Sequence, residues 1–270
     1  MLKSRILTAL VLALALLAVL FWLPEHWSVL AFGVTFTVGA WEWAGFGALH
    51  GTAARVGYAI VIALLLLFSW LWTRELENAL ILMAAACAWW IVAFLWLALN
   101  PMWRQPVLAL FCGIPVLVPA FAALARLQVA SHGFARGPDV VLWLLLLVFA
   151  ADIGAFFAGR SLGRLKLAPR VSPGKTWEGA VGGIVTVAAV AWAGAYRFGL
   201  PIFTGVAFGC AVGIFSIVGD LTESMFKRAV GLKDSGNLLP GHGGVLDRID
   251  SVTAAAPLYA LGLFGSGVLA

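Results

Sequence analysis

The stretch from Ser224 to Asp250, SMFKRAVGLKDSGNLLPGHGGVLDRID, mixes carboxylates, cations and glycines in a way that suits phosphate and metal chemistry. Carboxylates bind Mg²⁺, cations neutralise phosphate oxygens, and glycines let the backbone approach a ligand and offer N–H donors. With two acidic residues just upstream, this composition predicts a metal–nucleotide site. Its candidate residues are Asp220, Glu223, Ser224, Lys227, Arg228, Lys233, Asp234, His242, Gly243, Gly244, Asp247, Arg248 and Asp250.

Helical spacing brings some of these side chains together. Four of them share one face if the preceding apolar segment continues as a helix: Asp220, Glu223, Ser224 and Lys227. Asp247 and Asp250 likewise share a face where the last apolar segment begins. Two carboxylate-bearing helix ends could therefore converge on one or two metal ions. The alternative is a solvated loop with exposed ion pairs worth about 0–1 kcal/mol each, but ionisable residues near membrane depth favour the site.

A second polar stretch runs from Asp152 to Gly179. Asp152 stands inside an apolar segment, where a bare charge is costly, so we expect it to face a polar cavity or a cation. Four cations follow it, whose ordinary role is contact with lipid headgroups at about 1 kcal/mol per charge: Arg160, Arg164, Lys166 and Arg170.

The end of this stretch resembles a phosphate-binding P-loop only superficially. A Gly-Lys-Thr run is present, but Pro169 stands where that motif needs its first glycine, and we expect no strand before it. What remains is a lysine and two hydroxyls beside a helix N-terminus, which is a good local anion site. Its candidate residues are Ser172, Lys175, Thr176 and Glu178.

The elements that must position these residues are membrane-spanning helices. The chain is 63% hydrophobic and 11% charged, whereas soluble domains have about 45–50% apolar and about 25% charged residues. The three cysteines form no CxxC pair that would indicate zinc or a disulfide framework. About nine segments are long and apolar enough to span a bilayer, and they cover residues 5–23, 28–48, 56–72, 79–99, 107–125, 139–158, 179–197, 201–221 and 251–269.

We therefore expect an all-α, polytopic integral membrane protein in two parts. Residues 1–125 would form a scaffold of five spans, and residues 126–270 a catalytic part of four spans with polar loops at 159–178 and 222–250. With the N-terminus in the cytoplasm, all but four of the 17 Lys and Arg residues lie on the cytoplasmic side, as the positive-inside rule demands. The four exceptions are Arg74, Arg126, Arg136 and Arg197. Both long loops then face the cytoplasm.

At this point the residues resemble a known family, the phosphatidate cytidylyltransferases (CDP-diacylglycerol synthases). The run from Ser224 to Asp250 resembles that family's signature, Ser-x-x-Lys-Arg, Lys-Asp, His-Gly-Gly and Asp-Arg-x-Asp in order. The upstream SPGKTWEG resembles its Ser-Pro-x-Lys-Thr-x-Glu-Gly block, and Asp152 with Gly159 and Arg160 resembles a third. The three blocks cover the C-terminal half of the chain.

The resemblance implies that phosphatidate attacks the α-phosphate of CTP, with Mg²⁺ required. Asp220 and Asp247 would be the first metal ligands, assisted by Glu223 or Asp250. Lys227, Arg228, Lys233 and Arg248 would hold phosphates of the signature site, and Ser172, Lys175 and Thr176 those of one substrate. The implied substrate contacts also include Glu178, Ser224, Asp234, His242, Gly243 and Gly244, with Asp152 nearby.

Further expectations concern partners and location. The sequence leaves open a second cation such as K⁺ and a homodimer, and nucleic acid is not an expected partner. The enzyme would sit in the inner membrane, with its active site facing the cytoplasm.

Two alternatives stay open. A CTP-dependent lipid or polyprenol kinase would share the setting but would release CDP rather than pyrophosphate. An ion transporter, a different class of protein, would use Asp152 and Glu42 as ion-pathway residues. Glu42 lies between two tryptophans in the second apolar segment, and without an evident partner we expect it to be structural.

Overall fold

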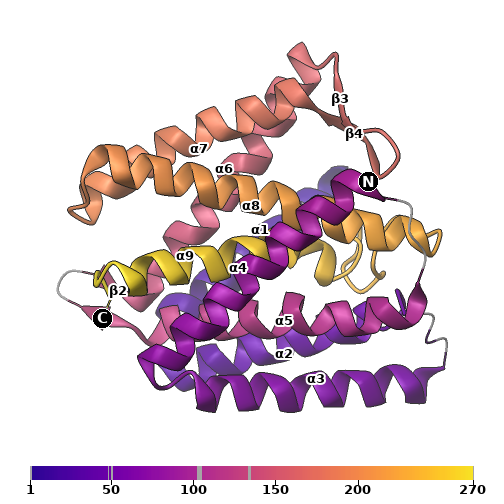
Figure 1. Ribbon diagram of the computed structural model, residues 1–270, viewed down its shortest axis with the longest axis horizontal. Helices are drawn as coiled ribbons and strands as arrows, with labels where there is room; N and C mark the ends of the chain where they lie inside the picture. The colour runs from indigo at the N-terminus through magenta and orange to yellow at the C-terminus, as the bar shows by residue number, and fades with distance from the viewer. Residues whose placement is uncertain (1, 48, 50, 102–104, 133–134, 270) are drawn as a thin grey trace.

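The computed structural model describes residues 2–47, 49, 51–101, 105–132 and 135–269. Nine helices account for most of the described chain, and two short hairpins interrupt them (Figure 1). The helices are α1 (Leu2–Phe21), α2 (Glu25–Trp43), α3 (Thr52–Trp72), α4 (Leu76–Leu99), α5 (Pro106–Val129), α6 (Gly137–Leu162), α7 (Trp177–Arg197), α8 (Ile202–Ala229) and α9 (Leu246–Gly265). The strands are β1 (Ser131–His132), β2 (Ala135–Arg136), β3 (Lys166–Ala168) and β4 (Ser172–Thr176).

Each apolar segment expected from the sequence coincides with one helix. Such segments become helices in lipid because every backbone N–H and C=O must be paired within the chain. Six of the described helices, α3 to α8, are long and apolar enough to cross a membrane. The all-α membrane architecture is therefore confirmed, while the full count of nine spans stays a prediction.

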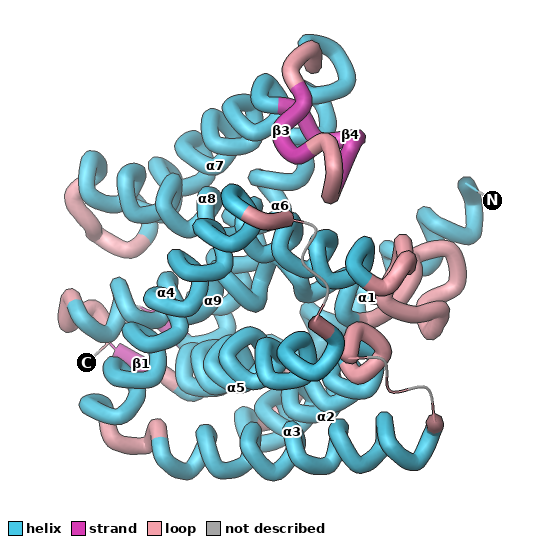
Figure 2. Tube along the Cα trace, turned by 45° about the vertical axis from the view of Figure 1, so that its right-hand side comes forward, coloured by secondary structure: helices cyan, strands magenta, loops and turns pink. Residues whose placement is uncertain are grey.

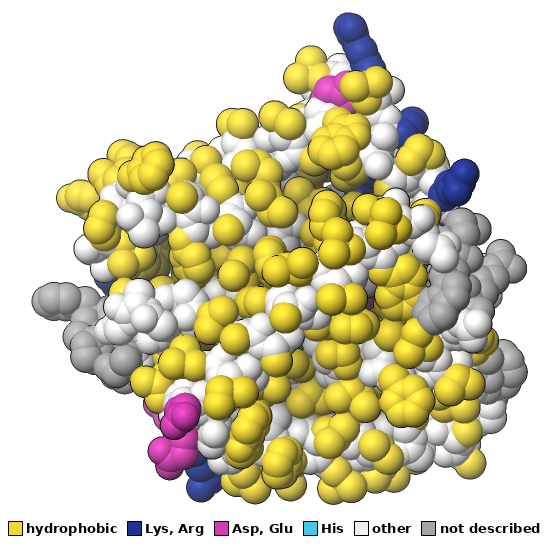
Figure 3. All heavy atoms as spheres, in the orientation of Figure 1, with side chains coloured by type: hydrophobic (Ala, Val, Ile, Leu, Met, Phe, Trp, Pro, Cys, Tyr) yellow, Lys and Arg dark blue, Asp and Glu magenta, His cyan; other side chains and the backbone are white. Residues whose placement is uncertain are grey.

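The surface of the molecule also suits a bilayer. Large apolar side chains are exposed on many helices, including Leu64, Phe111, Val185 and Phe203. Hydrophobic side chains cover most of the face seen in Figure 3, and Lys and Arg side chains gather at the end where β3 and β4 lie. A soluble monomer rarely exposes so continuous an apolar surface, so these helices face lipid.

The helices pack around α5, whose second half is almost entirely buried. α2, α3 and α9 contact it, and α4 and α8 pack against α9 (Figure 2). α6 and α7 form a long antiparallel pair that α8 joins along one side. The N-terminal helices thus contact the helix that carries the end of the signature, because α2, α4 and α5 all touch α9.

Small residues let α6 and α7 approach closely, as is typical of helix pairs in membranes. A Cβ atom added to Gly182 would lie 2.2 Å from the Cβ of Ala158, and one added to Gly154 would lie 2.2 Å from Oγ1 of Thr186. These distances are too short for real atoms. The pair would therefore have to separate to admit even one methyl group.

We expect Gly182→Ala to lower the melting temperature of the protein in detergent. Overpacking a well-packed contact costs about 1–3 kcal/mol, which outweighs the roughly 1 kcal/mol that alanine gains over glycine in a helix. Gly57→Ala in α3 is the matched control, because apart from its neighbours in the helix no described residue comes within 4 Å of its added Cβ. An equal or higher melting temperature for Gly182→Ala would contradict this packing.

The two polar loops are shorter than the expected ranges, because regular elements extend into both. In the stretch 159–178, α6 continues to Leu162, and the antiparallel pair β3–β4 fills most of the rest. In the stretch 222–250, α8 continues to Ala229, and α9 begins at Leu246. The expectation that no strand precedes the Gly-Lys-Thr run is wrong, since β3 precedes the run and the run itself forms the end of β4. A P-loop is still excluded by Pro169 and by the two-stranded antiparallel pairing.

Candidate active site

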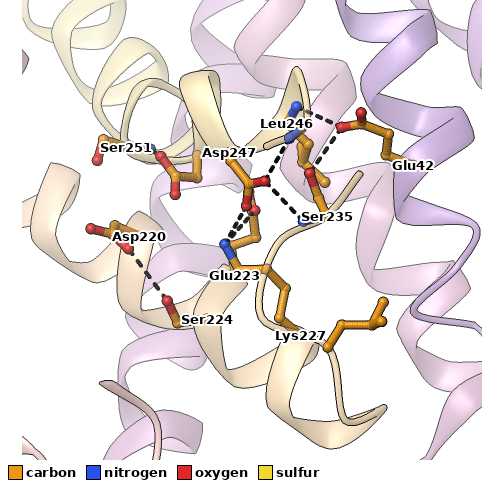
Figure 4. A network of polar contacts seen from close by, with 12 residues as sticks. Glu42, Asp220, Glu223, Ser224, Lys227, Ser235, Leu246, Asp247 and Ser251 are labelled. Carbon is orange, nitrogen blue, oxygen red and sulfur yellow. Dashed lines mark hydrogen bonds and ion pairs between the residues drawn. The ribbon is translucent and has the colours of Figure 1, made fainter. Parts of the chain in front are cut away.

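The extension of α8 brings its polar residues to one place. The helix continues past the apolar segment to Ala229, so Asp220, Glu223 and Lys227 lie on successive turns of one face, as the spacing predicted. The first turn of α9 carries Asp247 and packs against this end of α8. Figure 4 shows the two helix ends and the loop between them meeting around a network of polar contacts.

Lys227 lies at the centre of this network. Its Nζ is 2.6 Å from Oδ1 of Asp247 and 3.1 Å from Oε1 of Glu223. The three side chains are 8%, 6% and 3% exposed, respectively. Because buried charges are costly unless they are paired, this lysine holds the two carboxylates together. The predicted convergence of α8 and α9 is confirmed, with a lysine between their carboxylates.

Asp247 also fixes the loop that precedes α9. Its Oδ2 accepts hydrogen bonds from the backbone N–H of Ser235 at 2.9 Å and of Gly244 at 2.8 Å. Burial disfavours the charged form, but the hydrogen bonds from Lys227 and these N–H groups outweigh it, and the pKa of the Asp247 carboxyl lies below its usual range. Gly243 adopts a φ of 82°, which favours glycine, and its lack of a Cβ leaves room for the same carboxylate, since an added Cβ would lie 2.7 Å from Oδ2.

Glu223 is the carboxylate whose oxygens are the least satisfied. It is 3% exposed, yet among the described residues neither oxygen accepts a hydrogen bond of good geometry, and its one ion pair is with Lys227. Asp250, one turn after Asp247, accepts a hydrogen bond from the N–H of Ser251 at 2.7 Å. A buried carboxylate oxygen without a donor is a free ligand position for a cation.

These carboxylates suit a Mg²⁺ ion that is shared with a bound substrate. Within the described residues no group of three or more His, Cys, Asp or Glu side chains is arranged to hold a metal alone. Mg²⁺ at nucleotide sites uses one or two carboxylates together with substrate phosphates and waters. Asp220 and Glu223 are the candidates for those carboxylates. Neither oxygen of Glu223 accepts a hydrogen bond from a described residue, and Asp220 has one ion pair and one long hydrogen bond, whereas three hydrogen bonds occupy the oxygens of Asp247.

Asp220 faces the β3–β4 hairpin. Its Oδ2 forms an ion pair with Nζ of Lys175 in β4, and its Oδ1 accepts a hydrogen bond from Oγ of Ser224 at 3.4 Å. Asp152, on α6, lines the same pocket of about 400 Å³ as Asp220 and Lys175. Asp152 thus lines a cavity that also contains a cation, Lys175, although apolar groups make up most of its lining. The pocket also includes the apolar side chains of Phe156 and Ile217.

Two of the other predicted substrate contacts in this stretch hold the hairpin in place. Thr176 is the N-cap of α7, and its Oγ1 accepts a hydrogen bond from the N–H of Gly179 at 3.1 Å. The Glu178 carboxylate accepts from the N–H of Leu165 at 3.2 Å. Ser172 lies in β4, where it pairs with Ala168. Lys175 is thereby presented from a short, well-anchored strand.

A second pocket, of about 550 Å³, lies on the loop side of the network. It is lined by predicted contacts of the signature, namely Lys233, Asp234, His242, Gly243 and Arg248, together with Asn237. Arg228 does not line it: Nε and Nη1 of Arg228 donate to the carbonyl oxygens of Val171 at 3.2 Å and Leu232 at 2.7 Å. That arginine ties the end of α8 to the hairpin.

The sequence reasoning missed the partner of Glu42. This residue of α2 is 1% exposed, and its carboxylate accepts hydrogen bonds from Ser235, Val245 and Leu246, all in or next to the signature loop. The available signal was a lone acidic residue within an apolar segment. The loop motif gave no indication that a helix two hundred residues earlier would hold it.

Comparisons with known proteins identify the family of this chain. A sequence model of the cytidylyltransferase family matches residues 3–264. The protein named phosphatidate cytidylyltransferase of Pseudomonas aeruginosa is 43% identical, over 99% of this chain and 98% of that protein. Those of Haemophilus influenzae and Brucella suis are 39% and 36% identical, over 96% and 98% of this chain and 98% and 93% of theirs. The chain, matched along nearly its whole length, belongs to the cytidylyltransferase family.

Proposed function

We propose that this protein is a CTP:phosphatidate cytidylyltransferase, which makes CDP-diacylglycerol and pyrophosphate at the cytoplasmic face of a bacterial inner membrane. The observation that carries the proposal is the meeting of α8, α9 and β4, where the signature carboxylates and lysines converge between two pockets. Full-length relatives that bear this name support it.

The chemistry needs positioning more than proton transfer. A phosphate oxygen of phosphatidate forms a bond to the α-phosphorus of CTP. The bond from that phosphorus to the oxygen between the α- and β-phosphates breaks, and pyrophosphate leaves. The second pKa of a phosphomonoester is about 6, so the nucleophile is already largely ionised at neutral pH. The protein therefore has to align the two phosphates and neutralise their charge.

The chain offers cations on both sides of the carboxylate network for that task. Lys175 and Asp220 line one pocket. Lys233 and Arg248 line the other, together with Gly243. Two pockets that flank one network suit a reaction with two phosphate-bearing substrates. Lys227 is buried in ion pairs here, so its action on the phosphates would pass through the carboxylates that it orients.

Mg²⁺ is part of the proposal. Asp220 and Glu223 would hold it, with Asp247 or Asp250 assisting, and it would supply charge neutralisation at the CTP phosphates. A second cation such as K⁺ and a homodimer stay predictions. Nine spans with a cytoplasmic N-terminus complete the proposed topology, which is supported by the positive-inside distribution and by the cations gathered near the hairpin (Figure 3).

The test is turnover of purified protein in detergent with phosphatidate, Mg²⁺ and CTP labelled in separate reactions at the α- or the γ-phosphate. We expect the α label to enter the lipid and the γ label to appear in pyrophosphate, and EDTA to stop both. Transfer of the γ label to the lipid, with release of CDP, would instead identify a lipid kinase. Folded protein that gives neither product would contradict the proposal.

The two residues that would support a transporter, Glu42 and Asp152, both lie at or beside the proposed active site. Glu42 bonds to the signature loop and not to a pathway across the membrane. Asp152 lines the same pocket as Lys175 and Asp220, beside the network.

A further inference from the structure

Glu42 lies in α2, within the N-terminal part that the sequence suggested was only a scaffold. Its Oε2 accepts hydrogen bonds from Oγ of Ser235 at 2.9 Å and from the N–H of Leu246 at 2.8 Å. Its Oε1 accepts one from the N–H of Val245 at 3.1 Å. Figure 4 shows the carboxylate pointing from α2 toward the start of α9. All three donors belong to the segment that ends the signature.

The start of α9 provides the positive charge that this buried carboxylate needs. Among the described residues no Lys, Arg or His forms an ion pair with Glu42. The first N–H groups of a helix lack partners within the helix and carry partial positive charge. The residue before α9 is Val245, whose side chain cannot cap them. Glu42 therefore caps α9 from a different helix.

Two signature glycines make room for this carboxylate. A Cβ added to Gly236 would lie 2.4 Å from Oε1 of Glu42, and its three nearest atoms would all belong to that side chain. A Cβ added to Gly244 would lie 2.2 Å from Oγ of Ser235, which itself bonds to Glu42, and 2.4 Å from Oε2 of Glu42. These glycines were expected to bring the backbone close to phosphate. In the structure they bring it close to Glu42.

The same loop is held from its other side by Asp247. Ser235 donates its N–H to Asp247 and its hydroxyl to Glu42, and Gly244 donates its N–H to Asp247. The loop is thus fixed between two carboxylates, one from α2 and one from α9. Loss of the first would free the loop that orients the second.

We propose that Glu42 is a positioning residue for cytidylyl transfer, which sets the signature loop and the start of α9 so that Asp247 and the second pocket face the substrates. The proposal rests on the proposed function. It assigns to the N-terminal helices a direct part in forming the site.

The test is a double-mutant cycle of the full chain with Glu42→Ala, Gly236→Ala and the double variant. Gly236→Ala should lower both kcat and the melting temperature in the wild-type background, because the added methyl overlaps Glu42. In the Glu42→Ala background the same substitution should cost little further, because the overlapping atoms are gone. Additive losses in melting temperature would overturn the contact, whatever reaction the protein catalyses.

Glu42→Gln separates positioning from simple stability. The amide keeps the size but turns an NH₂ group toward backbone N–H donors, so we expect kcat to fall up to about 10²-fold, the loss typical of a misplaced catalytic group. The KM for phosphatidate should change less than kcat, measured well below the melting temperature. Glu77→Gln, at an exposed position at the start of α4, is the matched control.

A Glu42→Gln variant with wild-type kcat would overturn the positioning role. If the wild-type protein made no CDP-diacylglycerol, the proposed function and the positioning role would both fall. The melting-temperature cycle would still decide whether Glu42 holds the loop.

Discussion

Asp247→Asn will remove nearly all cytidylyltransferase turnover, with a loss of about 10³-fold or more in kcat. The carboxylate holds Lys227 with one oxygen and the N–H groups of Ser235 and Gly244 with the other. An amide cannot accept on both sides, so either the lysine or the loop loses its partner. Each misplaced group of this kind costs about 10²–10³-fold in an electrostatically organised site, and two are affected here.

The same substitution should lower the stability of the protein by about 1–3 kcal/mol, the usual cost of leaving a buried donor unsatisfied. Lys227 keeps its ion pair with Glu223, so the protein should still fold in detergent. Stability is followed as the melting temperature, and turnover is measured well below it, so that unfolding does not mimic the catalytic loss.

Asp139→Asn is the matched control. Asp139 forms an i,i+3 ion pair with Arg136 at 3.0 Å, and the Arg136 side chain is 73% exposed, so the pair should contribute about 0–1 kcal/mol. The control should keep wild-type turnover and nearly the wild-type melting temperature. If Asp247→Asn behaved in the same way, the network around Lys227 would have no part in catalysis.

The helices of the fold could be predicted because their cause is local. A run of about 20 apolar residues in lipid forms a helix because its backbone N–H and C=O groups must pair within the segment. Each of the nine expected segments coincides with a helix. The shared face of Asp220, Glu223 and Lys227 followed from the 3.6-residue period in the same way. Both inferences needed only neighbouring residues.

What could not be predicted depends on contacts between distant helices. The sequence context of Lys227 predicts a phosphate-binding residue. In the structure its side chain lies between Glu223 and Asp247, because α8 and α9 pack there. Glu42 had no visible partner until α2 was placed against the start of α9. The β3–β4 hairpin was missed because its strands are three and five residues long, too short for an alternating pattern to stand out.

Lys175→Gln should reduce kcat/KM by about 10²–10³-fold, the usual effect of removing one preorganised charge from a phosphate-transfer site. Lys175 comes from β4, lines the pocket on the α6 side, and pairs with Asp220. Its side chain is 28% exposed, so a phosphate can reach it. Lys166→Gln, an exposed lysine of the partner strand β3, is the control and should keep wild-type kinetics.

The paired variant Asp220→Asn tells whether the Lys175–Asp220 contact serves catalysis or only holds the hairpin. If Asp220 binds Mg²⁺ and Lys175 binds phosphate, the two substitutions should change different kinetic quantities. Asp220→Asn should raise the Mg²⁺ concentration needed for half-maximal turnover, whereas Lys175→Gln should raise the KM of a substrate at an unchanged Mg²⁺ requirement. Equal losses in both variants, no greater in the double variant and with no change in either requirement, would instead mean that the two residues act only as one ion pair between β4 and α8.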